Sequence, residues 1–194
     1  MSISLVAGLG NPGREYEGSR HNLGWLVVDA YASKHGLSWR AAPEFDAMVA
    51  RRDAGPGSVL WLMKPLTFMN ESGRSVGAMA RYHRVPADSV AAAYDDLTID
   101  LGLVKVSVSG SDAGHNGVAS LIEHLGQGFS RYRLGVGPRQ PPEMDMKDFV
   151  LARFTPDQLN IIKQKSEFYV QGLELLLASG PDRAMNQLNR RDTK

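Results

Sequence analysis

The stretch that decides the fold is Ile3-Ser-Leu-Val-Ala-Gly-Leu-Gly-Asn-Pro-Gly13, near the start of the chain. Residues 3–9 form a short apolar run that a cluster of glycines closes, which predicts a buried strand. A helical pattern begins only after an interval, with apolar residues on one face from Leu23 to Tyr31, and Gly36 is placed to end it. A buried strand followed by a loop and a helix is typical of an α/β protein.

The alternation of strands and helices continues along the chain. Two strand-like segments, 45–52 and 58–64, flank the turn-rich residues 53–57 and predict a hairpin. Further strands are predicted at 89–94, 103–108 and 131–136, and further helices at 70–86, 116–125 and 155–180. We therefore expect a single domain over residues 1–194, an α/β three-layer sandwich with a mixed, mostly parallel twisted sheet flanked by helices.

Two segments do not fit regular elements. Residues 138–148 are rich in proline and polar side chains and are too long for an ordinary turn, which predicts a mobile segment. Residues 186–194 are polar and basic, and we expect a flexible tail there.

The composition excludes several classes of protein. The 194 residues include 22 Lys and Arg against 21 Asp and Glu, and 43% are hydrophobic, which fits a globular domain with a sizeable core. The absence of cysteine excludes a disulfide framework, a thiolate zinc site and a cysteine nucleophile. The sequence has neither an apolar run of about 18 residues nor a signal-peptide pattern, so we expect a soluble cytoplasmic protein without membrane contact.

The loop Gly8–Gly13 matches half of a dinucleotide-binding fingerprint, G-x-G-x-x-G after a strand. In that fingerprint a helix follows the glycines at once and its N-terminus holds the pyrophosphate, whereas here residues 14–18 intervene. The acidic residue expected at the end of a second strand is also missing, because Asp29 falls within a helical pattern. A tight strand-exit loop that presents the Asn11 amide is the favoured interpretation, and titration with NAD would test the alternative.

Two His-Asn pairs, at His21 and His115, each stand just before a predicted helix. The helix dipole disfavours imidazolium there, which suits a general base. Asp95 and Asp96 follow a predicted strand, and a carboxylate at that edge could orient an imidazole. The alternatives are structural: helix capping by Asn22, Asn70 and Asn116, and turn formation by the aspartates.

The missing motifs narrow the chemistry. A G-x-S-x-G elbow, an S-x-x-K motif and a Walker A loop are all absent from the sequence, so covalent catalysis and P-loop phosphoryl transfer have little support. A zinc site from His21, Asp95 and His115 remains an alternative, but no H-E-x-x-H or close histidine pair supports it, and we expect no metal. Water activated by histidine, with amide donors for an oxyanion, indicates hydrolysis of an ester or amide.

The sequence closely resembles the bacterial-type peptidyl-tRNA hydrolase family over almost its whole length. Five ordered motifs carry the resemblance: Gly8-Leu-Gly-Asn-Pro-Gly-Arg-Glu-Tyr16, Arg20-His-Asn-Leu-Gly24, Lys64-Pro-Leu-Thr-Phe-Met-Asn-Glu-Ser-Gly73, Tyr94-Asp-Asp-Leu97 and Gly114-His-Asn-Gly117. The resemblance implies a monomeric enzyme without cofactor that cleaves the ester between a peptide and the terminal ribose of tRNA, and so recycles tRNA after aborted translation.

The resemblance also implies roles for individual residues. His21 would be the catalytic base and Asp95 its orienting partner. Amide side chains would hold substrate, water or oxyanion, with Tyr16, Met69 and His115 lining the same cleft; the amides are those of Asn11, Asn70 and Asn116. Lys105 and Arg133 would clamp the phosphate at the tRNA end. Segment 138–148 and the C-terminal helix would act as gate and lid.

The chain departs from the family pattern at four positions. Asp112 stands in a loop that usually contains small residues, Ser107 and Ala119 occupy positions that are often basic, and Tyr94 replaces a frequent histidine. These changes affect the extent of the basic patch around Lys105 and Arg133 that would contact tRNA, and they leave the catalytic residues unchanged. A tRNA-binding module without activity is the alternative from another functional class, and it would retard tRNA on a gel without cleaving the ester.

Overall fold

The computed structural model describes residues 2–55 and 58–190, whose strands form one seven-stranded sheet in the order β2-β3-β4-β1-β5-β7-β6. The strands are β1 (Leu5–Gly8), β2 (Arg40–Ala42), β3 (Ala47–Gly55), β4 (Ser58–Pro65), β5 (Val90–Asp100), β6 (Val104–Ser107) and β7 (Ser130–Gly137). The central strands β4, β1, β5 and β7 run parallel, while β2, β3 and β6 add antiparallel pairings at the edges. The predicted mixed sheet is therefore confirmed.

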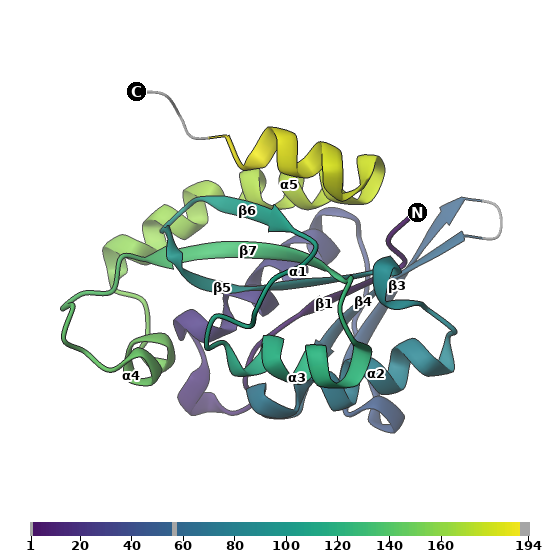
Figure 1. Ribbon diagram of the computed structural model, residues 1–194, viewed down its shortest axis with the longest axis horizontal. Helices are drawn as coiled ribbons and strands as arrows, with labels where there is room; N and C mark the ends of the chain where they lie inside the picture. The colour runs from purple at the N-terminus through teal and green to yellow at the C-terminus, as the bar shows by residue number, and fades with distance from the viewer. Residues whose placement is uncertain (1, 56–57, 191–194) are drawn as a thin grey trace.

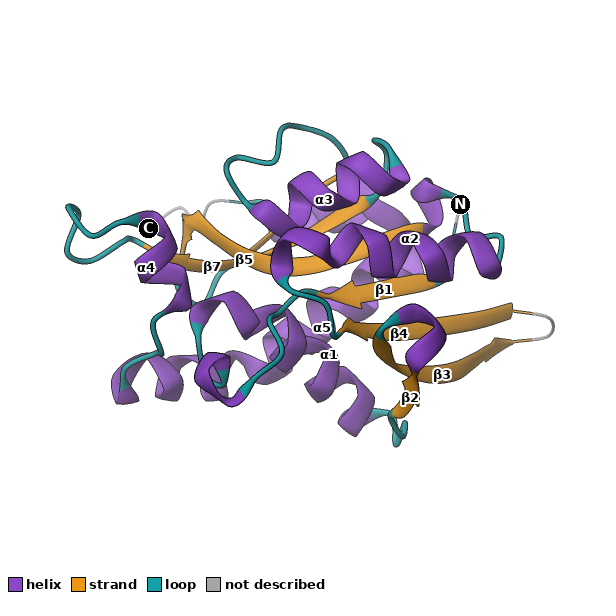
Figure 2. Ribbon diagram, turned by 90° about the horizontal axis from the view of Figure 1, so that it is seen from below, coloured by secondary structure: helices purple, strands orange, loops and turns teal. Residues whose placement is uncertain are grey.

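Helices cover both faces of the sheet. Helices α1 (Leu23–Lys34) and α5 (Pro156–Leu188) pack on one face, and α2 (Ser72–Tyr82) and α3 (Asn116–Leu125) on the other (Figures 1 and 2). Strand β1 is buried on both sides because successive side chains alternate: Val6 joins the core under α1 and α5, whereas Leu5 and Ala7 join the core under α2 and α3. The three predicted layers are present.

The glycines of the first loop bring β1 and α1 together. A Cβ at Gly8 would stand 2.5 Å from the carbonyl oxygen of Gly24, and one at Gly10 would stand 2.8 Å from the Trp25 ring. Gly13, with φ of 113°, then leads into a 3-10 turn over Arg14–Tyr16 rather than into a helix. The glycine pattern thus serves close packing, which agrees with the interpretation as a strand-exit loop.

Strand β5 is longer than predicted. The aspartate pair was expected just after a strand ending at residue 94, but the strand continues to Asp100 through an irregularity between Asp96 and Asp100. The physical reason is pairing with β7, which keeps Asp95 and Asp96 in register with Leu134 and Gly135. Both aspartates are buried within the sheet rather than placed in a turn.

The C-terminal region also differs from the prediction. Helix α5 begins with a capping box between Thr155 and Gln158, as expected, but it extends past residue 180 to Leu188 with a break at Gly180. Asn189 then exchanges two 2.8 Å hydrogen bonds with the backbone of Val106 on the edge strand β6. The prediction of a flexible tail from residue 186 is therefore wrong for its first residues, because the segment after Gly180 is helical to Leu188 and ends against the edge strand β6. Residues 191–194 lie outside the described residues.

Two smaller elements complete the comparison. Strand β2 was not predicted, since it has three residues and two of them are exposed. Helix α4 (Met146–Leu151) begins inside the segment 138–148, so that segment is partly helical, and the mobility predicted for it stays a prediction. Across residues 2–55 and 58–190, the helices are all too short or too polar to traverse a lipid bilayer.

Candidate active site

A cleft of about 1020 Å³ opens at the carboxyl ends of the parallel strands. That edge is where open α/β sheets bind ligands, because the loops leaving the strands converge there. All predicted site residues except Lys105 line the cleft: Asn11, Tyr16, His21, Met69, Asn70, Asp95, His115, Asn116 and Arg133. Lys105 instead lies on β6, directly opposite Arg133 on β7.

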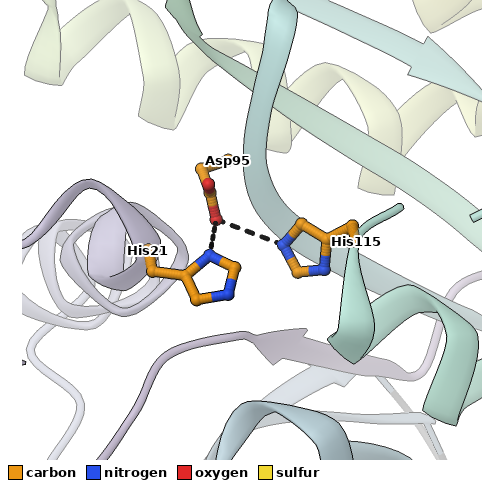
Figure 3. A group of neighbouring side chains, drawn as sticks. All are labelled: His21, Asp95 and His115. Atoms are coloured by element: carbon orange, nitrogen blue, oxygen red, sulfur yellow. Dashed lines mark hydrogen bonds and ion pairs between the residues drawn. The ribbon is translucent and has the colours of Figure 1, made fainter. Parts of the chain in front are cut away.

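Three side chains meet at the centre of the cleft (Figure 3). The Oδ1 atom of Asp95 lies 2.8 Å from Nδ1 of His21 and 3.2 Å from Nε2 of His115. The two imidazole centroids are 4.8 Å apart and the rings are tilted by 45°. Both rings therefore hydrogen-bond the same oxygen. Asp95 and His21 are only 2% and 7% exposed, so the carboxylate is shielded from bulk water.

The hydrogen bonds of His115 decide which of its nitrogens carries the proton. Its Nδ1 accepts from the backbone N–H groups of Gly117 and Val118, at 3.1 and 3.3 Å. A nitrogen that accepts two hydrogen bonds is unprotonated, so the proton of the ring is on Nε2, which donates it to Asp95. His115 is thus the N-cap of α3, and the capping role considered for Asn116 is wrong.

His21 has the complementary arrangement. An ionised carboxylate only accepts hydrogen bonds, so Nδ1 of His21 donates to Asp95 and Nε2 is left as the acceptor. In Figure 3 this Nε2 points away from Asp95. The arrangement holds His21 in the tautomer that a general base requires.

The ionisation of Asp95 follows from its surroundings. Burial is the largest influence and acts to raise the pKa, but the electrostatic attraction of the neighbouring His21 ring and the hydrogen bonds from His115 and His21 together outweigh it. They hold the pKa of the Asp95 carboxyl below its ordinary value. Asp95 is therefore an anion throughout the neutral range.

A second network fixes the amide of Asn11. Its Oδ1 accepts from the backbone N–H of Met69 at 2.7 Å, which leaves the NH₂ group as the free end of the amide. Asn22 accepts from the backbone N–H of Asn11 at 2.9 Å and donates to its carbonyl at 3.0 Å. Asn22 does stand at the N-cap position of α1, as considered, but its side chain makes no capping hydrogen bond; sequence reasoning missed its support of Asn11.

The remaining amides, Asn70 and Asn116, are exposed at the cleft wall. Glu71, not Asn70, is the N-cap residue of α2, so the capping alternative for Asn70 is also wrong. Tyr16 stacks edge-on against the exposed ring of Phe68 at 6.4 Å and forms an apolar end of the cleft.

The charge of Arg133 at the cleft is partly neutralised. Arg133 donates from Nε to Asp96 at 2.9 Å, and Thr98 donates to the other oxygen of that carboxylate.

Asp112 accepts from the backbone N–H of Gly114 at 2.9 Å and so shapes the loop that leads to His115. Tyr94 packs edge-on against the His115 ring, and burial raises its pKa to about 12, so it keeps its proton.

His21, Asp95 and His115 are also the group that could hold a metal ion in the described part of the chain, with ligand atoms within 4.8 Å of one another. The cap on His115 argues against this use. A metal at Nε2 would displace its proton while Nδ1 still faces two N–H donors, and the ring would have to become an imidazolate. The geometry favours a hydrogen-bonded triad over a metal centre.

Comparisons with known proteins identify the family of the chain. The family profile described as peptidyl-tRNA hydrolase matches residues 5–194. The chain is 42% identical to the peptidyl-tRNA hydrolase of Gloeobacter violaceus, over 98% of this chain and 96% of that protein. It is 43% identical to the protein of the same name from Anaeromyxobacter sp. (strain K), over 97% of each.

A solved structure of peptidyl-tRNA hydrolase from Acinetobacter baumannii superposes with a TM-score of 0.87 at 31% identity, covering 96% of this chain and 94% of that one. The matches span nearly the full length of both partners and agree in sequence and in fold. The chain therefore belongs to the peptidyl-tRNA hydrolase family and is a hydrolase.

Proposed function

We propose that this protein hydrolyses the ester bond that joins a peptide to the terminal ribose of tRNA, and so returns tRNA to translation. The observation that carries the mechanism is the hydrogen bond between His21 Nδ1 and Asp95, which leaves His21 Nε2 free in the cleft. Nε2 accepts a proton from water, the water oxygen attacks the ester carbonyl, and the ribose hydroxyl leaves with a proton from the imidazolium.

Neutral donors would stabilise the oxyanion that forms on the carbonyl. The NH₂ group of Asn11 is the best supported of these donors, because the Met69 N–H holds the amide oxygen while Asn22 holds the backbone of Asn11. Asn70 and Asn116, which also line the cleft, would contact the peptide or the ribose. A preorganised donor of this kind lowers the activation free energy by about 3–4 kcal/mol at most.

The tRNA end would be held through few phosphate contacts. Arg133 and Lys105 face each other across β6 and β7, so both can reach one phosphate at the rim. Arg133 is already bonded to Asp96, which lowers its capacity for additional anions. With few phosphate contacts, we expect the affinity for tRNA to depend only weakly on salt concentration. We also propose that the protein acts as a cytoplasmic monomer without a cofactor.

The test is hydrolysis of an N-acetylated aminoacyl-tRNA by His21→Asn. We expect release of the acyl group to fall below one hundredth of the unmodified rate, about the contribution of a general base, while the melting transition is unchanged. His35→Asn is the matched control, because His35 is bonded to Glu174 on the surface between α1 and α5. Retained activity in His21→Asn would contradict the proposal, and tRNA binding without cleavage by the unmodified protein would favour a binding module.

A further inference from the structure

Two arginines in this protein are buried without a carboxylate partner. Arg20 is 6% exposed and Arg131 is 3% exposed, and neither forms an ion pair with any residue in 2–55 or 58–190. Each guanidinium donates instead to backbone carbonyl groups, and each lies over a phenylalanine ring, Phe149 at 4.2 Å and Phe129 at 5.2 Å. In each, Nε is left without a hydrogen-bond partner.

Arg20, the residue before the proposed base, binds the end of α4. It donates to the carbonyls of Phe149, Ala152 and Arg153 at 3.1–3.2 Å, and to the side chain of Gln158 at 2.9 Å. The last carbonyls of a helix have no partner within it, so Arg20 completes the C-terminal end of α4. Because α4 forms one wall of the cleft, this contact fixes that wall beside His21.

Arg131 binds the opposite wall, the loop 110–114. It donates to the carbonyls of Gly110 and Ser111, both at 2.6 Å. Ala113 in this loop has φ of 51°, a left-handed conformation that is unfavourable for a residue other than glycine, so contacts from outside the loop help to hold it. It leads directly to His115, whose ring hydrogen-bonds Asp95.

The two walls meet at the mouth of the cleft. A Cβ built on Gly114 would stand 3.4 Å from the terminal carbon of Met146, the first residue of α4. Each wall is held by an arginine at one end and touches the other wall near its free end. Burying two charges without counter-ions is costly, and burial lowers the pKa of Arg20.

We propose that Arg20 and Arg131 are positioning residues that set the separation of the two cleft walls for catalysis. Arg131 acts on the chemical step through the loop, His115 and Asp95. Arg20 acts on the wall that covers the substrate, and so on binding. The effect on hydrolysis rests on the proposed function, whereas the anchoring of the walls does not.

The test uses Arg131→Lys and Arg20→Lys, which keep the charge and lose the forked donor geometry. For Arg131→Lys we expect kcat to fall about ten-fold, equivalent to about 1.4 kcal/mol, with KM within about two-fold. For Arg20→Lys we expect KM to rise about ten-fold with kcat within about three-fold. Arg51→Lys is the control, because Arg51 is exposed, pairs with Asp53 on β3 and does not line the cleft; both kinetic constants of this variant should be unchanged.

Amide hydrogen exchange supplies a readout independent of activity. Exchange should accelerate at residues 112–118 in Arg131→Lys and at residues 146–153 in Arg20→Lys, and stay unchanged in the other wall. If a lysine variant does not fold, Arg131→Gln and Arg20→Gln remove the buried charge, retain an NH₂ donor group and carry the same test. Uniformly faster exchange with unchanged kcat and KM would overturn the proposal; failure of the unmodified protein to cleave peptidyl-tRNA would overturn the proposed function and leave the exchange test intact.

Discussion

Replacing Asp95 with Asn keeps the shape of the side chain and removes its charge. With the amide oxygen in the place of Oδ1, it still accepts from His21 at 2.8 Å and His115 at 3.2 Å, so both tautomers are retained. A hydrogen bond to an ionised group contributes about 1.5–3 kcal/mol and a neutral one about 0.5–1.5 kcal/mol. The bond from His21 is weakened by about 1–1.5 kcal/mol and the developing imidazolium also loses its counter-charge, so we expect a loss of about 2–3 kcal/mol in the stabilisation of imidazolium during the reaction.

This loss corresponds to a fall in kcat of about 30- to 150-fold, at 1.36 kcal/mol per factor of ten. Asp95→Ala is expected to be worse, by about 10³- to 10⁴-fold, because His21 then loses the acceptor that fixes its tautomer. His115 cannot adapt, since the α3 amides keep the proton on Nε2. The assay is release of the acyl group from N-acetylated aminoacyl-tRNA at saturating substrate, with melting curves for each variant. Activity of Asp95→Asn within about three-fold of the unmodified enzyme, or equal losses in both variants, would refute the reasoning.

Three further outcomes are expected. The lowered pKa of Asp95 stabilises the fold fully above the ordinary value of about 3.9, and this contribution is lost as the pH falls below it; urea unfolding at pH 6 and pH 3 should show a smaller acid loss for Asp95→Asn, and parallel losses would contradict the assignment. Asn11→Asp keeps the acceptor for Met69 and removes the free NH₂ donor, so kcat should fall about 10²- to 10³-fold with little change in melting temperature, and an active Asn11→Asp would exclude the amide as a donor. Gly24→Ala places a Cβ 2.6 Å from the backbone of Leu9 and should cost about 1–3 kcal/mol in the free energy of unfolding, whereas Gly77→Ala meets the flexible end of Arg81 at 3.1 Å and stays 3.3 Å or more from His124, and so serves as the control.

Much of the fold is predictable because apolar periodicity and glycine placement act locally. Residues 3–9 indicate a buried strand, and Gly24 lies where α1 crosses it closely. What escaped prediction depends on distant partners. Strand β5 continues past residue 94 because it pairs with β7. The helical segment after Gly180 is held by the hydrogen bonds between Asn189 and the backbone of Val106 on β6.

The site divides in the same way. The loops at the sheet edge indicate His21, Asp95 and His115, since strand ends and helix starts are visible in the sequence. The sequence does not reveal that the backbone of α3 caps His115, or that Asn22 holds Asn11, because each polar residue has an equally ordinary capping role. Arg20 and Arg131 were missed as anchors for a related reason: nothing in a sequence distinguishes an arginine that binds backbone carbonyls from one that meets solvent.

The near balance of charge in this chain is consistent with an RNA substrate once the cleft is considered by itself. Its aspartates are already hydrogen-bonded: Asp95 to two histidines, Asp96 to Arg133 and Thr98, Asp112 to a loop amide, and Asp145 to the first turn of α4. The reacting ester is neutral, so histidines and amides suit it better than a strong positive field. Under the proposed function, attraction for phosphate is then needed only at the rim, where Lys105 stands outside the cleft. Affinity for the tRNA and chemistry on the ester are thereby assigned to different surfaces, and the net charge of the whole chain constrains neither.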